Sequence, residues 1–305
     1  MSARDRTVSW SFGGTWPFEP LYGGAEGERL HYVDEGLREG TPVVLLHGNP
    51  AWAYLYRRFI PALTQAGHRA IAVDLLGFGR SDKPDDPAAY AIARHAERVG
   101  ALLDGLSLSD ACLVVHDWGG PIGLPWAAAN PERVSRLMIL NTFAPTLPGP
   151  MGKGGSLRLV RTRGLGELGA KVRDGLTEDF LLGSGTRHHD RLDSQAKDAY
   201  RAPHPDRASR TALLAFPRQV PLSAGGPVAE LTRRTDEALR RHFRDRPVHI
   251  SWGMRDVLFG EAVLDLWRES LPNAGVTRLD DAGHFVQEDA HELVIPDLLA
   301  LLAGA

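Results

Sequence analysis

The sequence has few of the features that mark secreted, disulfide-bonded or membrane-inserted proteins. Cys112 is the one cysteine in 305 residues, which excludes an internal disulfide, and its apolar neighbours predict a core residue. No run of about 18 uncharged apolar residues is present, so we expect no membrane span. Residues 1–6 carry charges of both signs and no apolar run follows them, so we expect no signal peptide.

The charge balance excludes further classes of partner. A net charge of −3 gives no excess of positive charge for nucleic acid or for an anionic membrane. The hydrophobic fraction of 43% and the charged fraction of 24% are ordinary for a globular enzyme. We therefore expect a cytoplasmic enzyme with no nucleic-acid partner and no membrane partner.

The sequence does contain short apolar runs that alternate with helical patterns. We predict strands at residues 28–35, 42–47, 68–74, 111–116, 134–140, 248–252 and 276–279. We predict helices near residues 53–66, 90–106, 119–129, 261–270 and 287–302. Several of the apolar runs are continuous, as expected of strands buried on both faces. The alternation predicts an α/β fold with a doubly wound, mostly parallel sheet.

The pattern changes between residues 143 and 246, which are rich in proline, glycine and arginine and contain no buried-strand run. Amphipathic helical pieces are predicted there at residues 156–170, 176–183, 193–200, 208–215 and 227–243. We therefore predict a core formed by residues 1–142 and 247–305, with a helical cap at 143–246. Ligands bind at the carboxyl edge of open α/β sheets, so we expect the cap to cover that edge.

Residues 114–120 have the layout of a strand, a sharp turn and a helix, with Asp117 at the turn. Serine is the usual residue at such a turn. A carboxylate forms an ester with an alkyl carbon, whereas a serine alkoxide suits acyl carbons, so Asp117 favours carbon–halogen or epoxide opening. The alternative role for Asp117 is a helix N-cap. Val115 departs from the pattern, because a small residue is expected two positions before the nucleophile.

Two later residues complete a candidate triad in the order nucleophile, acid, histidine. His284 follows a predicted strand and is placed to take a proton from water. Asp256 follows the preceding strand and would hold the tautomer of His284. The alternatives are a capping histidine, and a turn aspartate paired with Arg255. Residues 141–143, after another strand, offer no carboxylate, which favours Asp256 as the acid.

Asn49 and Trp118 each carry a side-chain N–H donor at a predicted strand end. Two donors that converge on a leaving halide would stabilise its developing charge, and the backbone N–H groups of the same residues would form an oxyanion hole for the later tetrahedral intermediate. The alternatives are a turn-forming asparagine and a packed indole. The adjacent histidines at 188–189 point apart, and the glycines of residues 77–82 lack phosphate-loop spacing, so we predict no metal and no cofactor.

Four segments resemble the haloalkane dehalogenases, and the resemblance covers roughly residues 28–142 and 200–300. The segments are residues 47–50, 77–84, 116–121 and 216–221. The resemblance implies the α/β-hydrolase fold, with an inserted helical cap and a halide site formed by Asn49 and Trp118. It also implies the subgroup whose acid follows the later strand, because Phe143 stands where the other subgroups have glutamate. By the same analogy Phe216 and Pro217 line the halide pocket.

The predicted reaction is hydrolysis of a small apolar haloalkane to alcohol, halide and proton, with water as the second substrate. It would proceed through an alkyl ester of Asp117. An epoxide hydrolase is the nearest alternative, but that family usually uses two cap tyrosines as acids, and residues 143–246 contain only Tyr200. A cofactor-free oxygenase or a ligand receptor on the same fold is a further alternative.

Overall fold

The computed structural model describes residues 9–143, 174–221 and 225–304. Its strands form one mixed sheet. Their order across the sheet is β1 (Leu21–Gly23), β2 (Leu30–Glu35), β4 (Arg69–Val73), β3 (Pro42–Leu46), β5 (Ala111–Asp117), β6 (Val134–Thr142), β7 (Val248–Gly253) and β8 (Gly275–Leu279). The predicted α/β class is therefore confirmed.

The sheet is parallel from β4 through β8 and antiparallel at its other edge. Strand β2 pairs antiparallel with β4, and β1 pairs antiparallel with β2. Every residue of β3, β4 and β5 is buried, as expected of strands covered on both faces. The prediction of a mostly parallel sheet is confirmed, whereas β1 was not predicted.

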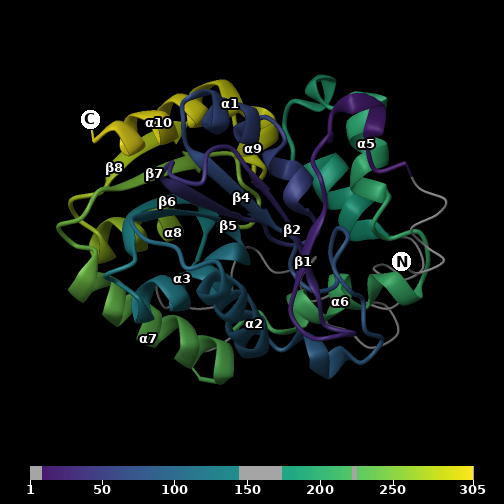
Figure 1. Cartoon of the computed structure of the whole chain (residues 1–305), viewed down its shortest axis with the longest axis horizontal. Coiled ribbons are helices and arrows are strands. Elements are labelled where there is room, and N and C mark those ends of the chain that lie inside the picture. The colour runs from purple at the N-terminus through teal and green to yellow at the C-terminus, as the bar shows by residue number, and fades with distance from the viewer. Residues whose placement is uncertain (1–8, 144–173, 222–224, 305) are drawn as a thin grey trace.

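Helices cover both faces of this sheet (Figure 1). The core helices are α1 (Phe59–Gln65), α2 (Ile92–Gly105), α3 (Gly119–Ala129), α7 (Pro227–His242), α8 (Glu261–Ser270), α9 (Val286–Asp289) and α10 (His291–Ala303). Helices α1, α9 and α10 lie on one side, and α2, α3, α7 and α8 lie on the other. No helix of the described residues has both the length and the apolar character that crossing a membrane requires.

Two predicted helices are broken in the structure. The helix expected at 287–302 is divided into α9 and α10 by Ala290, whose φ of −146° is not helical. The helix expected at 53–66 is a 3₁₀ turn, η3 (Ala53–Tyr56), followed by α1. Further 3₁₀ turns are η2 (Phe12–Gly14) and η4 (Pro87–Tyr90). These breaks follow from local backbone dihedrals, to which hydrophobic periodicity is insensitive.

Residues 174–221, the described part of the predicted cap, are helical, and α5 and α6 lie beside the sheet rather than on its faces (Figure 1). Their elements are the π-helix η6 (Leu176–Ser184), η7 (His189–Arg191), α5 (Ser194–Arg201), η8 (Ala208–Arg210) and α6 (Thr211–Arg218). The helix predicted at 156–170 lies outside the described residues. We call residues 174–221 the cap.

Helix α7 was assigned to the cap from its sequence, but it packs against α3 and α2. The side chains that it buries include Val228 and Leu239, on its apolar face. This packing favours a cap that ends before α7 rather than at residue 246. The division of the chain into core and cap stays a prediction.

Candidate active site

The turn at Asp117 has the geometry expected of a strand-to-helix elbow. Asp117 ends β5 with a φ of 49°, and α3 begins two residues later at Gly119. A Cβ on Gly119 would lie 2.4 Å from the carbonyl oxygen of Leu46, so the close approach of α3 to β3 requires glycine. Val115 is fully buried and pairs with Leu46 in the neighbouring strand, so the turn accommodates it.

The carboxylate of Asp117 is buried and held through one of its oxygens. Its Oδ1 accepts a hydrogen bond from the backbone N–H of Asn49 at 2.8 Å. A Cβ on Gly48 would lie only 2.1 Å from that oxygen, so glycine is required beside the carboxylate. Thr142 donates its hydroxyl hydrogen to the carbonyl oxygen of Asp117, which ties β6 to the turn. The other oxygen, Oδ2, faces the imidazole of His284.

His284 lies between two carboxylates and is fully buried. Its Nδ1 donates to Oδ2 of Asp256 at 2.9 Å, and its Nε2 lies 3.6 Å from Oδ2 of Asp117. Burial disfavours the charged imidazole, but Asp256 and Asp117 outweigh it and raise the pKa of His284 to about 10. The structure thus brings together the three residues predicted as a triad. The 3.6 Å distance exceeds a direct hydrogen bond, so Nε2 and Oδ2 are close but not bonded.

Asn141, at the end of β6, was not assigned a role from the sequence. Its Nδ2 donates to Oδ2 of Asp256 at 2.8 Å, and its Oδ1 accepts the N–H of Gly253 at 2.7 Å. The same oxygen of Asp256 therefore accepts from both Asn141 and His284. The signal available in the sequence was a polar residue at the carboxyl end of β6, the strand that lies between β5 and β7.

His116, just before Asp117, was also missed. Its Nε2 donates to the carbonyl oxygen of His284 at 2.9 Å, and the two rings lie 4.8 Å apart. Burial and the neighbouring charge of His284 lower the pKa of His116 to about 3, so the ring is neutral. His116 thus connects the elbow directly to the loop that carries His284.

The two predicted halide donors lie next to the carboxylate. Trp118 follows Asp117, and its indole makes edge contacts with Phe143 at 5.2 Å and Phe216 at 5.4 Å. The Nε1–H of Trp118 donates no hydrogen bond to any of the described residues. Asn49 donates through Nδ2 to the carbonyl oxygen of Leu213 in α6, at 3.3 Å. The next residue after Phe216, Pro217, is also buried in α6, so both predicted lining residues belong to the helix that approaches Asn49 and Trp118.

Aromatic side chains that no sequence motif marked complete the surroundings of the imidazole. The ring of Phe180, in η6, lies 5.3 Å from that of His284, and the ring of Phe259 lies 5.5 Å from it. Phe259 also contacts Phe143, at 5.6 Å. The carboxylate and imidazole are thus enclosed mainly by apolar rings, which exclude water and strengthen electrostatic interactions.

The described residues contain no group of three or more histidine, cysteine, aspartate or glutamate side chains placed to hold a metal ion.

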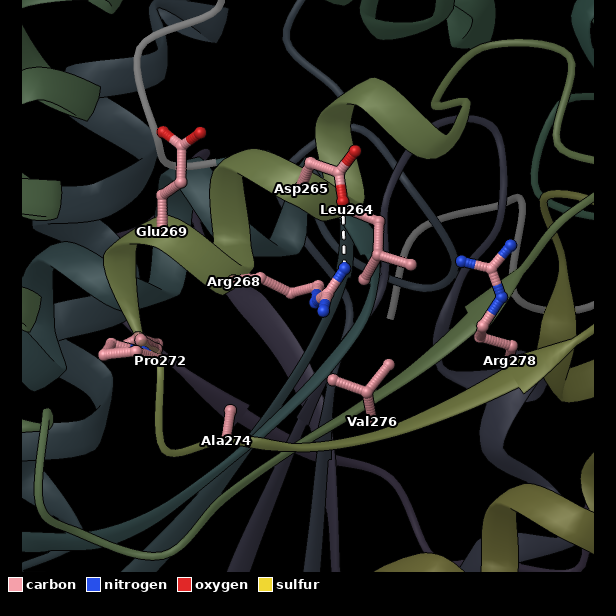
Figure 2. Close-up of a pocket in the computed structure, with 9 residues that line it drawn as sticks. Leu264, Asp265, Arg268, Glu269, Pro272, Ala274, Val276 and Arg278 are labelled. Atoms are coloured by element: carbon pink, nitrogen blue, oxygen red, sulfur yellow. Dashed lines mark hydrogen bonds and ion pairs between the residues drawn. The ribbon is translucent and has the colours of Figure 1, made fainter.

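A groove of about 730 Å³ lies outside the candidate site, between α8 and the edge strand β8. Figure 2 shows Asp265 and Arg268 of α8 on one side and Val276 and Arg278 of β8 on the other. None of the predicted site residues lines this groove. Its arginines are paired, Arg268 with Asp265 and Arg278 with Glu261. The groove therefore does not contribute to the candidate site.

Residues 41–291 match the family described as the alpha/beta hydrolase fold. The chain therefore belongs to the α/β-hydrolase fold family. A haloalkane dehalogenase of Mycolicibacterium paratuberculosis is 39% identical over 262 residues, which cover 86% of this chain and 83% of that protein. The chain thus belongs to the haloalkane dehalogenase family within that fold, and the resemblance predicted from its motifs is confirmed.

The same family relationship extends to proteins with another name. A cis-3-alkyl-4-alkyloxetan-2-one decarboxylase of Xanthomonas campestris pv. campestris is 36% identical over 283 residues, which cover 90% of this chain and 93% of that protein. Among solved structures, the haloalkane dehalogenase DpaA from Paraglaciecola agarilytica superposes with a TM-score of 0.82 at 29% identity. That alignment covers 97% of this chain and 95% of that chain.

Proposed function

We propose that this protein is a haloalkane dehalogenase that works through an alkyl ester of Asp117. The observation that supports the proposal is the position of the Asp117 carboxylate and the contacts of its two oxygens. One of its oxygens is held by the N–H of Asn49 at 2.8 Å, and the other is 3.6 Å from the imidazole of His284. A carboxylate in this position, enclosed by apolar rings, is suited to attack saturated carbon.

In the first step, Oδ2 of Asp117 attacks the carbon that bears the halogen. The carbon–oxygen bond forms as the carbon–halogen bond breaks, and the electron pair leaves with the halide. The indole N–H of Trp118 and the side-chain amide of Asn49 stabilise the halide, because donors aimed at developing charge act strongly in a site of low dielectric. The hydrogen bond from the Asn49 backbone to Oδ1 orients the nucleophile for this attack.

In the second step, His284 takes a proton from water, and the water oxygen attacks the carbonyl carbon of the ester. Esterification neutralises Asp117, which is one of the two carboxylates that raise the pKa of His284 to about 10. The pKa of the imidazole must therefore fall when the ester forms, so that His284 becomes a base when it is needed. Asp256 keeps the tautomer with the proton on Nδ1 and stabilises the imidazolium. The tetrahedral intermediate then breaks the bond between that carbon and the alkoxy oxygen, which takes the proton held by His284. The Asp117 carboxylate is regenerated, and alcohol, halide and a proton are released.

The test is halide release from 1-bromoalkanes of graded chain length. The wild type should turn over, and Asp117→Ala should release no halide. His284→Ala should release one halide per enzyme and retain the alkyl group on Asp117, which intact-mass measurement and peptide mapping detect. Steady turnover by His284→Ala would contradict the two-step scheme.

A second candidate is decarboxylation of a β-lactone, which the 36% identity to an oxetan-2-one decarboxylase favours. Asp117 would attack the ring carbon that bears the lactone oxygen, and the opened ring would end in a carboxylate. Loss of CO₂ would then supply the electron pair of a new C=C bond as the aspartyl ester C–O bond breaks. This route regenerates Asp117 without water. His284→Ala would therefore still turn over a β-lactone, and the alkene and CO₂ would be measured.

Epoxide hydrolysis, oxygenation and ligand binding without turnover are tested alongside. Epoxide opening needs an acid for the epoxide oxygen, but the hydroxyl of Tyr200 donates to the buried carboxylate of Glu288. Styrene oxide should therefore be a poor substrate. A cofactor-free oxygenase would oxidise a luciferin-type substrate with uptake of O₂, and a receptor would bind ligand without turnover. Either outcome, without halide release, would overturn the proposed function.

A further inference from the structure

The cap is hydrogen-bonded to the backbone of His284 itself. The carbonyl oxygen of Gly185, at the end of η6, accepts the N–H of His284 at 2.8 Å and the N–H of Phe285 at 3.3 Å. A Cβ on Gly283 would lie 2.6 Å from the Gly185 oxygen, so the two backbone segments are in direct contact. The other polar backbone group of His284, its carbonyl, accepts from His116. The backbone of His284 is therefore held by the cap through its N–H and by the elbow through its carbonyl.

The carboxylate of Asp289 joins the same two segments. It is 2% exposed, and it accepts the backbone N–H of Gly283 at 2.7 Å, of Arg187 at 2.9 Å and of His188 at 2.9 Å. Gly283 directly precedes His284, and the other two donors belong to the cap. A buried carboxylate is tolerated when several N–H groups solvate it, so these bonds stabilise the charge as well as the contact.

We propose that Asp289 is a positioning residue that holds His284 in place through Gly283 and couples it to the cap. The inference rests on the two-step reaction proposed above. Attack by Asp117 on the haloalkane does not require His284, whereas hydrolysis of the ester does. Loosening Asp289 should therefore slow hydrolysis and leave alkylation nearly unchanged. A purely structural role would lower stability without changing the ratio of the two rate constants.

The neighbouring residue Glu288 provides a matched control. It is fully buried, accepts from Arg57 and Arg58 at 2.8 Å each, and accepts from Tyr200 of α5. Glu288 therefore also joins the cap to the core through a carboxylate. Its carboxylate makes no hydrogen bond to residues 283–285. Asp289→Asn and Glu288→Gln therefore remove the same charge from adjacent positions. Only the first changes a carboxylate that is hydrogen-bonded to Gly283, the residue before His284.

The experiment compares the wild type with Asp289→Asn and Glu288→Gln in single-turnover reactions with a 1-bromoalkane. Rapid-quench measurement of bromide gives the alkylation rate constant, and intact-mass measurement of the ester gives the hydrolysis rate constant. We expect Asp289→Asn to lower the ratio of hydrolysis to alkylation by about 10-fold to 100-fold, with accumulated ester. Glu288→Gln should lower Tm while its ratio stays within about twofold of the wild type.

A second variant tests the contact from the cap side. A Cβ on Gly185 would lie 2.7 Å from the ring of Phe285, so Gly185→Ala should displace the carbonyl that holds His284 and give the same loss in the ratio. If the wild type turns over and both Asp289→Asn and Gly185→Ala keep its ratio, this inference alone is overturned. If the wild type releases no halide and forms no adduct, the proposed function fails, and this inference fails with it.

Discussion

Replacing His95 with phenylalanine should make the protein more resistant to acid. The ring of His95 is fully buried, stacked on Tyr90 at 6.0 Å and in edge contact with Phe216 at 4.8 Å. Neither ring nitrogen has a hydrogen-bond partner among the described residues. Burial, with smaller contributions from the neighbouring Arg98 and His47, lowers the pKa of His95 to about 3. The folded protein therefore excludes a proton that the unfolded chain binds.

The size of the effect follows from the two pKa values. The imidazole of an unfolded chain has a pKa of about 6.5, so at pH 5 unfolding is favoured by about 2 kcal/mol for each such histidine. The penalty is absent above pH 6.5 and grows as the pH falls toward 3. His116 and His204 also have a pKa of about 3, and the three together should cost about 6 kcal/mol at pH 5. Two groups whose pKa is raised oppose this loss between pH 8 and pH 5: Asp174, at about 6, by about 1 kcal/mol, and His284, at about 10, by about 2 kcal/mol.

The assay is urea unfolding at pH 8 and at pH 5, followed by tryptophan fluorescence. The loss in free energy of unfolding between the two pH values should be smaller in His95→Phe than in the wild type, by about 2 kcal/mol. Any packing change from the larger ring is present at both pH values and cancels. His189→Phe, at an exposed position of the cap, is the control and should keep the wild-type pH dependence. If His95→Phe also keeps it, the predicted cost of burying this imidazole is refuted.

Two further substitutions test the site directly. Gly48→Ala would place a Cβ 2.1 Å from Oδ1 of Asp117, so kcat/KM for haloalkane should fall by about 100-fold or more in the folded variant; an active variant would contradict the close approach. Asp256→Asn should lower the pKa of His284, which NMR titration measures, and should trap the ester. The stabilisation from charged His284, which in the wild type is present below pH 6.5 and is lost as the pH rises through about 10, should decrease in this variant. An unchanged pH dependence of stability between pH 7 and 10 would count against it.

The central sheet could be predicted because buried parallel strands are written as continuous apolar runs. Strands β3 and β5 are fully buried and were found from such runs. Strand β1 has three residues, of which Tyr22 is exposed, so no apolar run marks it. The antiparallel direction of β2 also has no local signal, because periodicity reports which faces are buried but not strand direction.

The candidate site could be predicted where its residues lie at strand ends. Asp117 ends β5, and Asp256 and His284 follow β7 and β8; the carboxyl ends of these strands share one edge of the sheet. Asn141 and Asp289 were missed because their roles depend on hydrogen bonds between segments that are distant in the chain. Such bonds follow from how the cap and loops pack, which the sequence pattern does not specify.

The backbone bond between Gly185 and His284 has a consequence for engineering. A chimaera that receives the insertion of a relative would acquire new side chains over the carboxylate, and with them a new preference for substrate shape. The same graft would replace the carbonyl that anchors the base. Grafts that retain residues 183–188 should therefore change the substrate preference and keep catalytic activity. Grafts that exchange these residues should lose catalytic activity, and with it any useful substrate preference.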